Sequence, residues 1–111
     1  MENQLESNPK KIGFFGGSFD PFHQGHFKMA SEAIELENFD PLLICPAHHA
    51  PLRDEKPLFS AKDRLAMVQA ISECHPKFFP YSYEIERERT CFTFETISSV
   101  LDKFPNSKVH V

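Results

Sequence analysis

The chain has 111 residues and a formal net charge of −4, values that fit a single domain and disfavour a long polyanion such as DNA as a partner. With 41% hydrophobic and 25% charged residues, the composition is that of a globular protein and excludes a disordered chain. No apolar run approaches the roughly 18 residues that a membrane-spanning helix needs, so we expect no membrane partner. Because of the net negative charge, we expect no nucleic-acid partner either.

The chain is expected to begin with a leader, a strand and a helix. Residues 1–10 are polar without a secretory signal, and we expect a flexible leader before one domain that spans residues 11–111. That domain opens with KIGFFG at residues 11–16, an apolar run that ends at glycines and predicts a buried strand. Apolar residues then recur at helical spacing and predict a helix from Gly25 to Glu37.

A second strand and a second helix are predicted next. The run LLIC at residues 42–45 lies between two prolines and predicts a short strand. Residues 47–60 carry two prolines and mixed charge, and loops of this length inside a domain are usually functional or disordered. Ser60 is the expected N-cap of the following helix. The apolar stripe of that helix consists of Leu65, Val68 and Ile71.

The last part of the chain predicts a strand, a helix and a strand. FFPYSYEIE at residues 78–86 predicts a third strand that is broken or at an edge near Pro80. The next helix has its apolar stripe at Phe94, Ile97, Leu101 and Phe104. KVHV at residues 108–111 opens a fourth strand.

The resulting order, βαβαβαβ, predicts a parallel sheet with right-handed crossovers, which is a Rossmann-like α/β fold. Because the sequence stops at Val111, inside an expected strand, we expect the domain to be truncated at its C-terminus.

The most informative stretch is GGSFDPFHQGH at residues 16–26, between the first strand and the first helix. Ligands of parallel α/β sheets bind near this turn, beyond the carboxyl ends of the strands. Gly16 and Gly17 allow close approach of the backbone and φ angles that other residues avoid. The helix start presents free N–H groups and a positive dipole end, which favour phosphate. His23 and His26 are three residues apart and share one face of the helix start.

The residues alone leave three interpretations open. In the first, His23 and His26 donate hydrogen bonds to a polyphosphate and to the charge that develops during its transfer. In the second, they ligate a metal ion together with Asp20 and His48 or His49, as in a metal-dependent hydrolase. In the third, the stretch is a capped helix with two incidental surface histidines. The Walker sequence and the GxGxxG fingerprint are both absent.

The stretch resembles the GG[ST]FDPxHxGH signature of the HxGH nucleotidyltransferases, and within them of the bacterial nicotinate-nucleotide adenylyltransferases. Three further segments resemble that family in the same order, namely ICPAHHAPLR, AKDRLAMV and EIERERTCFTFETI. Two alternatives are an inactive nucleotide-binding fragment of such an enzyme and a pantetheine-phosphate-type adenylyltransferase. His23 argues against the latter family, which carries Thr at that position.

The resemblance implies transfer of AMP from ATP, with Mg²⁺, to nicotinate mononucleotide, giving deamido-NAD and pyrophosphate in NAD biosynthesis. The attacking phosphomonoester has a second pKa of about 6 and is largely anionic at neutral pH, so alignment and electrostatic stabilisation suffice. The resemblance assigns His23 and His26 to the ATP phosphates and the transition state. It assigns nucleotide binding to Gly16, Gly17, Ser18, Phe19, Asp20 and Arg53.

Three of the remaining assignments depend on single positions. Asp20 is also expected to order the turn through local side-chain hydrogen bonds. Arg53 matches the basic position of a phosphate-binding loop of the family, although a leucine replaces the histidine before it. Thr93 matches a threonine near nicotinate mononucleotide, with Phe92 in place of a tyrosine and Glu95 in place of an aspartate.

Other expectations concern the rest of the molecule. Cys45, Cys74 and Cys91 are too few and too far apart for a disulfide framework or a CxxC metal site, so we expect reduced, mostly buried thiols in a cytoplasmic protein. Arg64 is expected to pair with a neighbouring acid. The family's second signature, which binds ATP phosphates, lies beyond residue 111, so half of the site is expected here. The partners are small-molecule substrates, and a homo-oligomer is compatible with the sequence.

Overall fold

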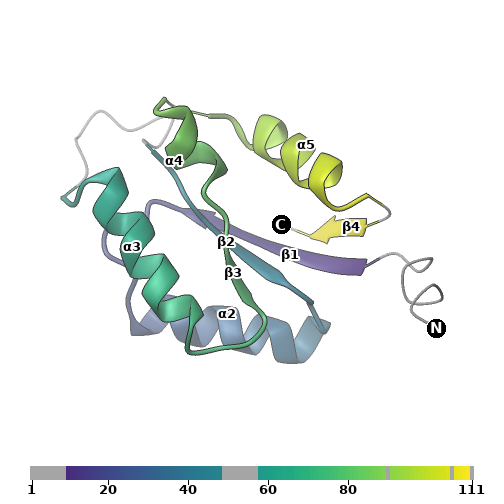
Figure 1. The fold of residues 1–111 in the computed structure, drawn as a ribbon. Coiled ribbons are helices and arrows are strands. Elements are labelled where there is room, and N and C mark those ends of the chain that lie inside the picture. The colour runs from purple at the N-terminus through teal and green to yellow at the C-terminus, as the bar shows by residue number, and fades with distance from the viewer. Residues whose placement is uncertain (1–9, 49–57, 90, 106, 111) are drawn as a thin grey trace.

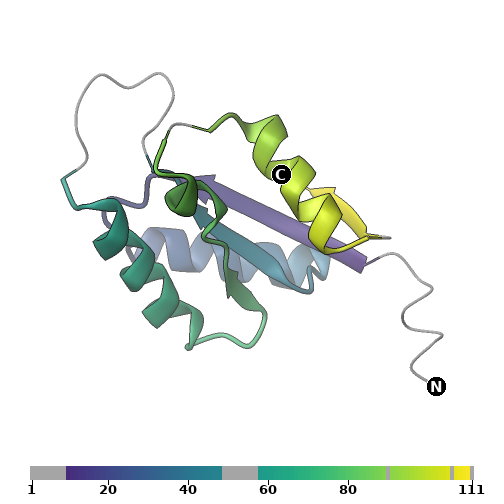
Figure 2. The ribbon, with the colours of Figure 1, turned by 45° about the horizontal axis from the view of Figure 1, so that its top comes forward.

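A four-stranded parallel sheet lies between two layers of helices (Figures 1 and 2). The computed structural model describes residues 10–48, 58–89, 91–105 and 107–110. The strands are β1 (Lys10–Gly17), β2 (Leu42–Pro46), β3 (Phe78–Pro80) and β4 (Ser107–His110). Their order in the sheet is β3-β2-β1-β4, and every pair is parallel. The Rossmann-like α/β fold predicted from the sequence is confirmed.

The helices are α2 (Gln24–Glu37), α3 (Ala61–Ser72), α4 (Tyr83–Arg87) and α5 (Thr93–Lys103). Helices α2 and α3 cover one face of the sheet, and α4 and α5 lie on the other (Figure 1). The core on the first face consists of Phe19, Phe22, Ala30, Ile34, Phe39, Leu42, Ile44, Val68 and Phe78. The core on the second face consists of Ile12, Phe14, Leu43, Cys45, Tyr81 and Val100.

The central strand β2 shows why a continuous apolar run becomes a strand here. All of its residues are buried. Leu42 and Ile44 belong to the core under α2 and α3, whereas Leu43 and Cys45 belong to the core under α5. A parallel strand that is covered on both faces has no polar side to expose, so its sequence does not alternate.

The predicted stripe of α2 and the predicted cap of α3 agree with the structure, whereas the predicted stripe of α3 is only partly right, because the buried residues of that helix are Arg64 and Val68 and do not include Leu65. Ala30 and Ile34 of α2 are buried. Ser60 is the N-cap of α3, and its Oγ accepts a hydrogen bond from the Asp63 N–H at 3.1 Å. This hydroxyl satisfies one of the backbone donors that a helix start leaves unpaired.

The strand predicted over residues 78–86 breaks at Pro80 and lies at an edge of the sheet, as expected, but the prediction of a strand is wrong beyond Pro80. Only Phe78–Pro80 pairs with β2, and Tyr83–Arg87 forms the short helix α4. Proline has no N–H to donate to a ladder, and the following residues make contacts that a helical turn supplies. The side chain of Ser82, the residue before α4, donates to Glu86, four residues later.

The predicted apolar stripe of α5 is also partly wrong. Phe94 is 77% exposed and Leu101 is 45% exposed, whereas Thr96 and Val100 are fully buried. A threonine can occupy the buried position because its Oγ1 donates to a Glu84 carboxylate oxygen at 2.6 Å, and a buried polar group with a partner carries little penalty.

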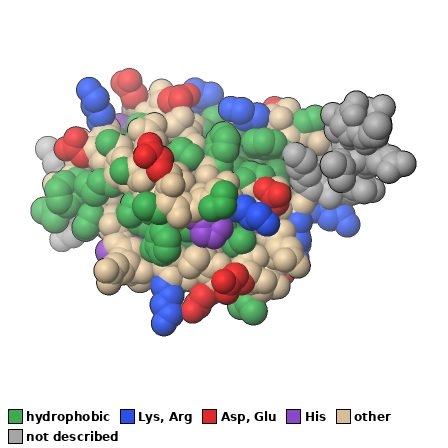
Figure 3. Space-filling view, turned by 60° about the horizontal axis from the view of Figure 1, so that its bottom comes forward, with side chains coloured by type: hydrophobic (Ala, Val, Ile, Leu, Met, Phe, Trp, Pro, Cys, Tyr) green, Lys and Arg blue, Asp and Glu red, His purple; other side chains and the backbone are tan. Residues whose placement is uncertain are grey.

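The surface of the α2 and α3 side carries hydrophobic side chains among acidic and basic ones (Figure 3). Met29 and Leu36 of α2 are among the exposed apolar residues. Across the described part of the chain, no helix has the length and apolar character needed to cross a membrane.

The three cysteines are free thiols. Cys45 and Cys91 are buried and Cys74 is exposed, so the expectation of mostly buried thiols is confirmed. Burial raises the pKa of the Cys45 thiol and, to a smaller extent, that of Cys91. Both therefore stay protonated and act as small apolar groups.

Candidate active site at the start of helix α2

Two histidines cap the first helix at the carboxyl edge of the sheet. His23 is the N-cap of α2, and its Nδ1 accepts a hydrogen bond from the Gly25 N–H at 3.1 Å. The Nδ1 of His26 accepts from the His23 N–H, also at 3.1 Å. Together the two bonds form a capping box. In such a box the side chain of the N-cap satisfies a backbone N–H of the first turn, and the side chain three residues later satisfies the N–H of the N-cap.

This cap determines which nitrogen of each ring can donate. A neutral imidazole whose Nδ1 accepts a hydrogen bond carries its proton on Nε2. The two rings stack with centroids 3.8 Å apart, so the helix start holds two neighbouring Nε2–H donors. Burial, and secondly the charge of His23, lower the pKa of His26, which keeps that ring neutral near pH 7.

The glycines before the cap work by lacking side chains and do not adopt unusual angles. Neither has a positive φ, so the sequence-based expectation on φ is wrong. A Cβ on Gly16 would lie 2.9 Å from the ring of Phe14, and one on Gly17 would lie 3.3 Å from the ring of Phe19. The left-handed conformation in this turn belongs to Phe19, with φ of 49°.

The ring of Phe19 packs against His26. It is buried and lies 5.1 Å, centroid to centroid, from each of Phe15, Phe22 and His26. Aromatic pairs at such separations stabilise each other through edge and offset contacts. Phe19 can therefore offer a nucleotide only its backbone, because its side chain belongs to the core.

Asp20 connects the turn to a distant segment. Its two carboxylate oxygens accept hydrogen bonds from the backbone N–H groups of Leu58 and Phe59, the latter at 2.7 Å. These partners lie 38 and 39 residues further along the chain, so the expectation of local hydrogen bonds is wrong. The carboxylate faces the residues before α3, where two donors already occupy it.

Arg64 is the residue that sequence reasoning missed at this edge. It is 1% exposed and bonds four backbone carbonyl oxygens instead of the acid that was expected. The acceptors are the carbonyl oxygens of Ser18, Ala47, His48 and Phe59. One signal was available, since Arg64 precedes Val68 and Ile71 by four and seven residues and so continues the buried stripe of α3.

The other predicted site residues are placed as follows. Arg53 and His49 lie outside the described residues. Thr93 is the first residue of α5 and is exposed. Helix α5 runs back from the carboxyl edge before β4 begins (Figure 1), so Thr93 lies at the same edge of the sheet as His23 and His26, in the opposite helix layer.

The described residues offer little to a tightly held metal ion. Within them, no group of three or more His, Cys, Asp or Glu is placed to bind one. The Nδ1 atoms of His23 and His26 and both oxygens of Asp20 already have backbone partners. The arrangement favours an anion that accepts N–H donors over a metal ion that would need free lone pairs.

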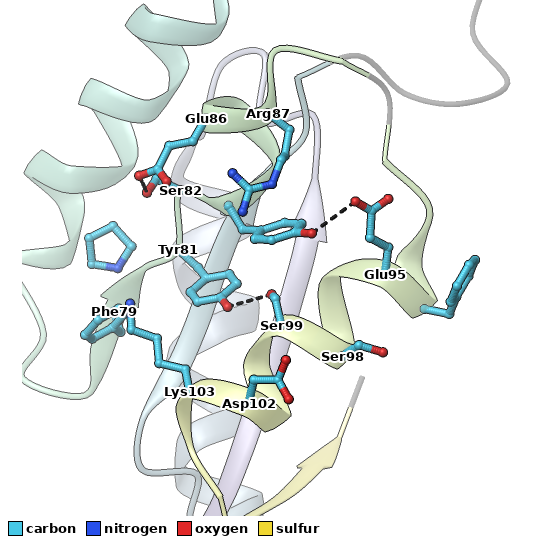
Figure 4. A pocket seen from close by; sticks show the side chains of 13 residues that line it. Phe79, Tyr81, Ser82, Glu86, Arg87, Glu95, Ser98, Ser99, Asp102 and Lys103 are labelled. Carbon is cyan, nitrogen blue, oxygen red and sulfur yellow. Dashed lines mark hydrogen bonds between the residues drawn. The ribbon is translucent and has the colours of Figure 1, made fainter.

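A separate recess lies between β3, α4 and α5 (Figure 4). Its volume is about 960 Å³, and none of its lining residues comes from the turn between β1 and α2. Tyr81 shares a hydrogen bond of 2.7 Å with Ser99, and the guanidinium of Arg87 lies 4.2 Å from the centre of the Tyr83 ring. No motif in the sequence indicates this surface.

The chain is similar to a known protein family and to curated proteins. Residues 14–105 match the model of a family described as cytidylyltransferase-like. The chain is 33% identical over 100 residues to the nicotinate-nucleotide adenylyltransferase of Bacillus subtilis, covering 90% of this chain and 53% of the relative. It is 40% identical over 101 residues to a probable nicotinate-nucleotide adenylyltransferase of Gemmatimonas aurantiaca, covering 91% and 47%.

A solved structure shows the same fold. The nicotinic acid mononucleotide adenylyltransferase of Plasmodium falciparum complexed with NaAD is similar with a TM-score of 0.73 at 21% identity, covering 90% of this chain and 49% of that one. The chain spans about half the length of the curated relatives that it matches.

Proposed function

The chain belongs to the cytidylyltransferase-like family, and on that basis we propose that its β1–α2 turn serves the transfer of AMP from ATP to nicotinate mononucleotide. The products are deamido-NAD and pyrophosphate. The observation that carries the proposal is that the Nδ1 atoms of His23 and His26 both accept backbone N–H groups at the start of α2, which leaves the Nε2–H of each neutral ring to donate. The names of the curated relatives at 33–40% identity support the choice of substrate.

The reaction needs alignment and charge stabilisation more than acid–base chemistry. A phosphate oxygen of the mononucleotide attacks the α-phosphorus of ATP, and the bond from that phosphorus to the oxygen bridging it to the β-phosphate breaks. The attacking oxygen is already anionic at neutral pH. His23 and His26 would donate to phosphate oxygens whose charge increases in the transition state, and the N-terminus of α2 would add its positive dipole end.

Mg²⁺ is proposed to enter as part of the ATP substrate. The ion commonly keeps several waters and binds through substrate phosphates with one or two carboxylates. Because no cluster of three ligands lies among the residues that the structure describes, the phosphates would supply most of its coordination. There it would neutralise charge on the leaving pyrophosphate.

The remaining site assignments complete the proposal. The backbone from Gly16 to Phe19 would lie against the nucleotides, with Asp20 holding the turn. Arg53 would bind phosphate. Thr93 would contact the mononucleotide from the opposite helix layer, since it lies at the same edge of the sheet as the histidines.

The test is release of pyrophosphate from ATP and Mg²⁺ with nicotinate mononucleotide, nicotinamide mononucleotide or phosphopantetheine as the acceptor. It is run on this chain and on any longer product of the same reading frame, with ATP binding measured in parallel. Release that is fastest with nicotinate mononucleotide is expected. Binding of ATP without release would support the alternative of a nucleotide-binding fragment, and no binding by either protein would contradict the proposal.

A further inference from the structure

Arg64 has no part in the chemistry proposed above, yet it is buried at the site. Among the described residues it is the only charged side chain in the buried core. Burial lowers the pKa of Arg64 and the nearby Asp20 opposes that shift, but a guanidinium stays protonated in proteins. A permanent cation in the interior therefore needs an explanation beyond packing.

Its hydrogen bonds join three segments that the sequence keeps far apart. Nη1 donates to the carbonyl oxygen of Ser18, directly after β1, at 2.9 Å, and also to that of Ala47. Nη2 donates to the carbonyl oxygen of His48, after β2, at 2.9 Å. Nε donates to the carbonyl oxygen of Phe59, before α3, at 3.0 Å. Only the planar fork of a guanidinium offers donors in enough directions for all four acceptors.

Asp20 completes the arrangement from the other side, and the two side chains together are called the Asp20–Arg64 clasp. Both side chains bond the backbone of Phe59: Asp20 accepts from its N–H, and Arg64 donates to its carbonyl oxygen. The clasp thus fixes the residues before α3 against the turn that precedes α2. Arg64 forms no ion pair within the part of the chain that the structure describes, so its charge is stabilised by backbone carbonyl dipoles together with the charge of the nearby Asp20.

The direction of those dipoles matters for an anion. The carboxyl ends of parallel strands present carbonyl oxygens at the edge where ligands bind, and such oxygens repel phosphate. Three oxygens of this kind, those of Ser18, Ala47 and His48, are instead directed toward a buried cation. In a region of low dielectric that positive charge also contributes to the potential at the site.

We propose that Arg64 is a positioning residue of the phosphate site, which directs the carbonyl oxygens after β1 and β2 away from the ligand and holds the turn that carries His23 and His26. The inference rests on the proposed function for the identity of the ligand. Arg64 acts through the backbone of Ser18 and does not touch the phosphates.

The first experiment compares binding of ATP with binding of adenosine, which lacks phosphates. Arg64→Lys keeps the charge but reaches fewer carbonyl oxygens, and Lys62→Met is the matched control because Lys62 is an exposed cation on the same helix. We expect Arg64→Lys to weaken ATP about tenfold, the effect of one or two lost charged hydrogen bonds, with adenosine binding unchanged. Equal losses for both ligands would show a merely structural role and overturn the proposal.

The second experiment does not depend on ATP. The ¹⁵N signals of the imidazoles report which nitrogen carries the proton, and the wild type should show the Nε2–H form of both His23 and His26. Arg64→Lys should give a mixture of tautomers, whereas Lys62→Met should not. If the wild type binds no ATP, the proposed function fails, while unchanged tautomers in Arg64→Lys would still overturn the positioning role.

A milder variant covers the case in which Arg64→Lys does not fold. Asp20→Asn retains the shape of the side chain but loses the charge that accepts two N–H groups. It should shift the tautomers of His23 and His26 in the same direction by a smaller amount. Wild-type tautomers in folded Asp20→Asn would contradict a role for the Asp20–Arg64 clasp in holding the turn.

Discussion

The two helix layers hold their polar side chains in different ways. Around α2 and α3 the charged groups Asp20 and Arg64 bond to backbone atoms of other segments. Around α4 and α5, most of the side-chain bonds among the described residues run to another side chain, although Ser99 also donates to the carbonyl oxygen of Thr96. These pairs are Tyr81 with Ser99, Tyr83 and Arg89 with Glu95, Ser82 with Glu86, and Thr96 with Glu84.

The difference separates a preorganised region from an adjustable one. A side chain that bonds the backbone fixes the path of the main chain, and with it the direction of the N–H groups at the start of α2. Preorganised donors of this kind stabilise developing charge without rearrangement during the reaction. Surface pairs such as Arg89 with Glu95 exchange readily with water and salt, so we expect the surface of the α4–α5 layer to adapt its shape more readily than the α2–α3 layer.

The largest effect should follow from removing a donor of the preorganised region. His26→Ala should lower the rate of pyrophosphate release by about 10²–10³-fold, the usual loss for one donor to a developing oxyanion. The assay is steady-state turnover with ATP and nicotinate mononucleotide.

Lys28→Ala, which removes an exposed cation from the same helix, is the matched control and should retain the wild-type rate. The circular dichroism spectrum of His26→Ala should stay that of a folded protein. A folded His26→Ala variant with a near-normal rate would contradict the role of this residue.

A smaller effect is expected from the cap of α3. Ser60→Ala removes the acceptor for the Asp63 N–H and should lower the free energy of unfolding by about 1 kcal/mol. Urea unfolding measures the change. The control is Ser98→Ala, which alters an exposed side chain on α5 and should stay within about 0.5 kcal/mol of the wild type. Equal stability of the two variants would show that the cap contributes nothing.

The α4–α5 layer should respond to pH. Burial raises the pKa of Glu84, with Glu95 adding to the shift and the Thr96 hydrogen bond opposing it. The pKa of Glu84 in the folded state therefore lies above its unfolded value of about 4.3. The stabilising contribution of Glu84 to the free energy of unfolding is fully present below the unfolded pKa and is lost as the pH rises through the folded pKa.

Glu84→Gln does not titrate and should be more stable than the wild type at neutral pH by at most about 1 kcal/mol, a value reduced because the group is only half buried. Urea unfolding at about pH 3 and about pH 7 should show this advantage at the higher pH alone. Glu86→Gln, which is exposed, is the control. An advantage that persists unchanged in acid would point to packing and not to charge.

The smallest effect concerns the exposed pair of Arg89 and Glu95. Glu95→Gln should leave the melting temperature almost unchanged, because exposed ion pairs contribute little and salt screens them. Thermal unfolding at low salt and at about 1 M salt measures this directly. A large loss at low salt would mean that the α4–α5 layer is as firmly held as the α2–α3 layer.

Features that depend on neighbours within one turn or one strand could be predicted from the sequence. The strand β2 between two prolines, the Ser60 cap and the histidines at the start of α2 are of this kind. The strand prediction over 78–86 failed because its Tyr and Ile content is typical of strands, whereas the bond from Ser82 to Glu86 belongs to a helical turn.

The connections across the site could not be predicted in the same way. The bond from Phe59 to Asp20 spans 39 residues and that from Arg64 to Ser18 spans 46. Both depend on the parallel order of β1 and β2, which brings the segments after these strands to one edge. Phe19 was expected to offer its backbone, but nothing in its neighbours indicated a left-handed φ for a bulky residue.

The cap of α2 depends on pH because two histidines form it. An imidazolium carries protons on both nitrogens, so a protonated His26 can no longer accept the N–H of His23. Acidification would add a positive charge to the ring of His26, which attracts phosphate. The same protonation would break the capping bond that holds the ring in place at the first turn of α2. At this helix start a protonated histidine would therefore bind phosphate less well than a neutral one, because it would no longer be held by the cap.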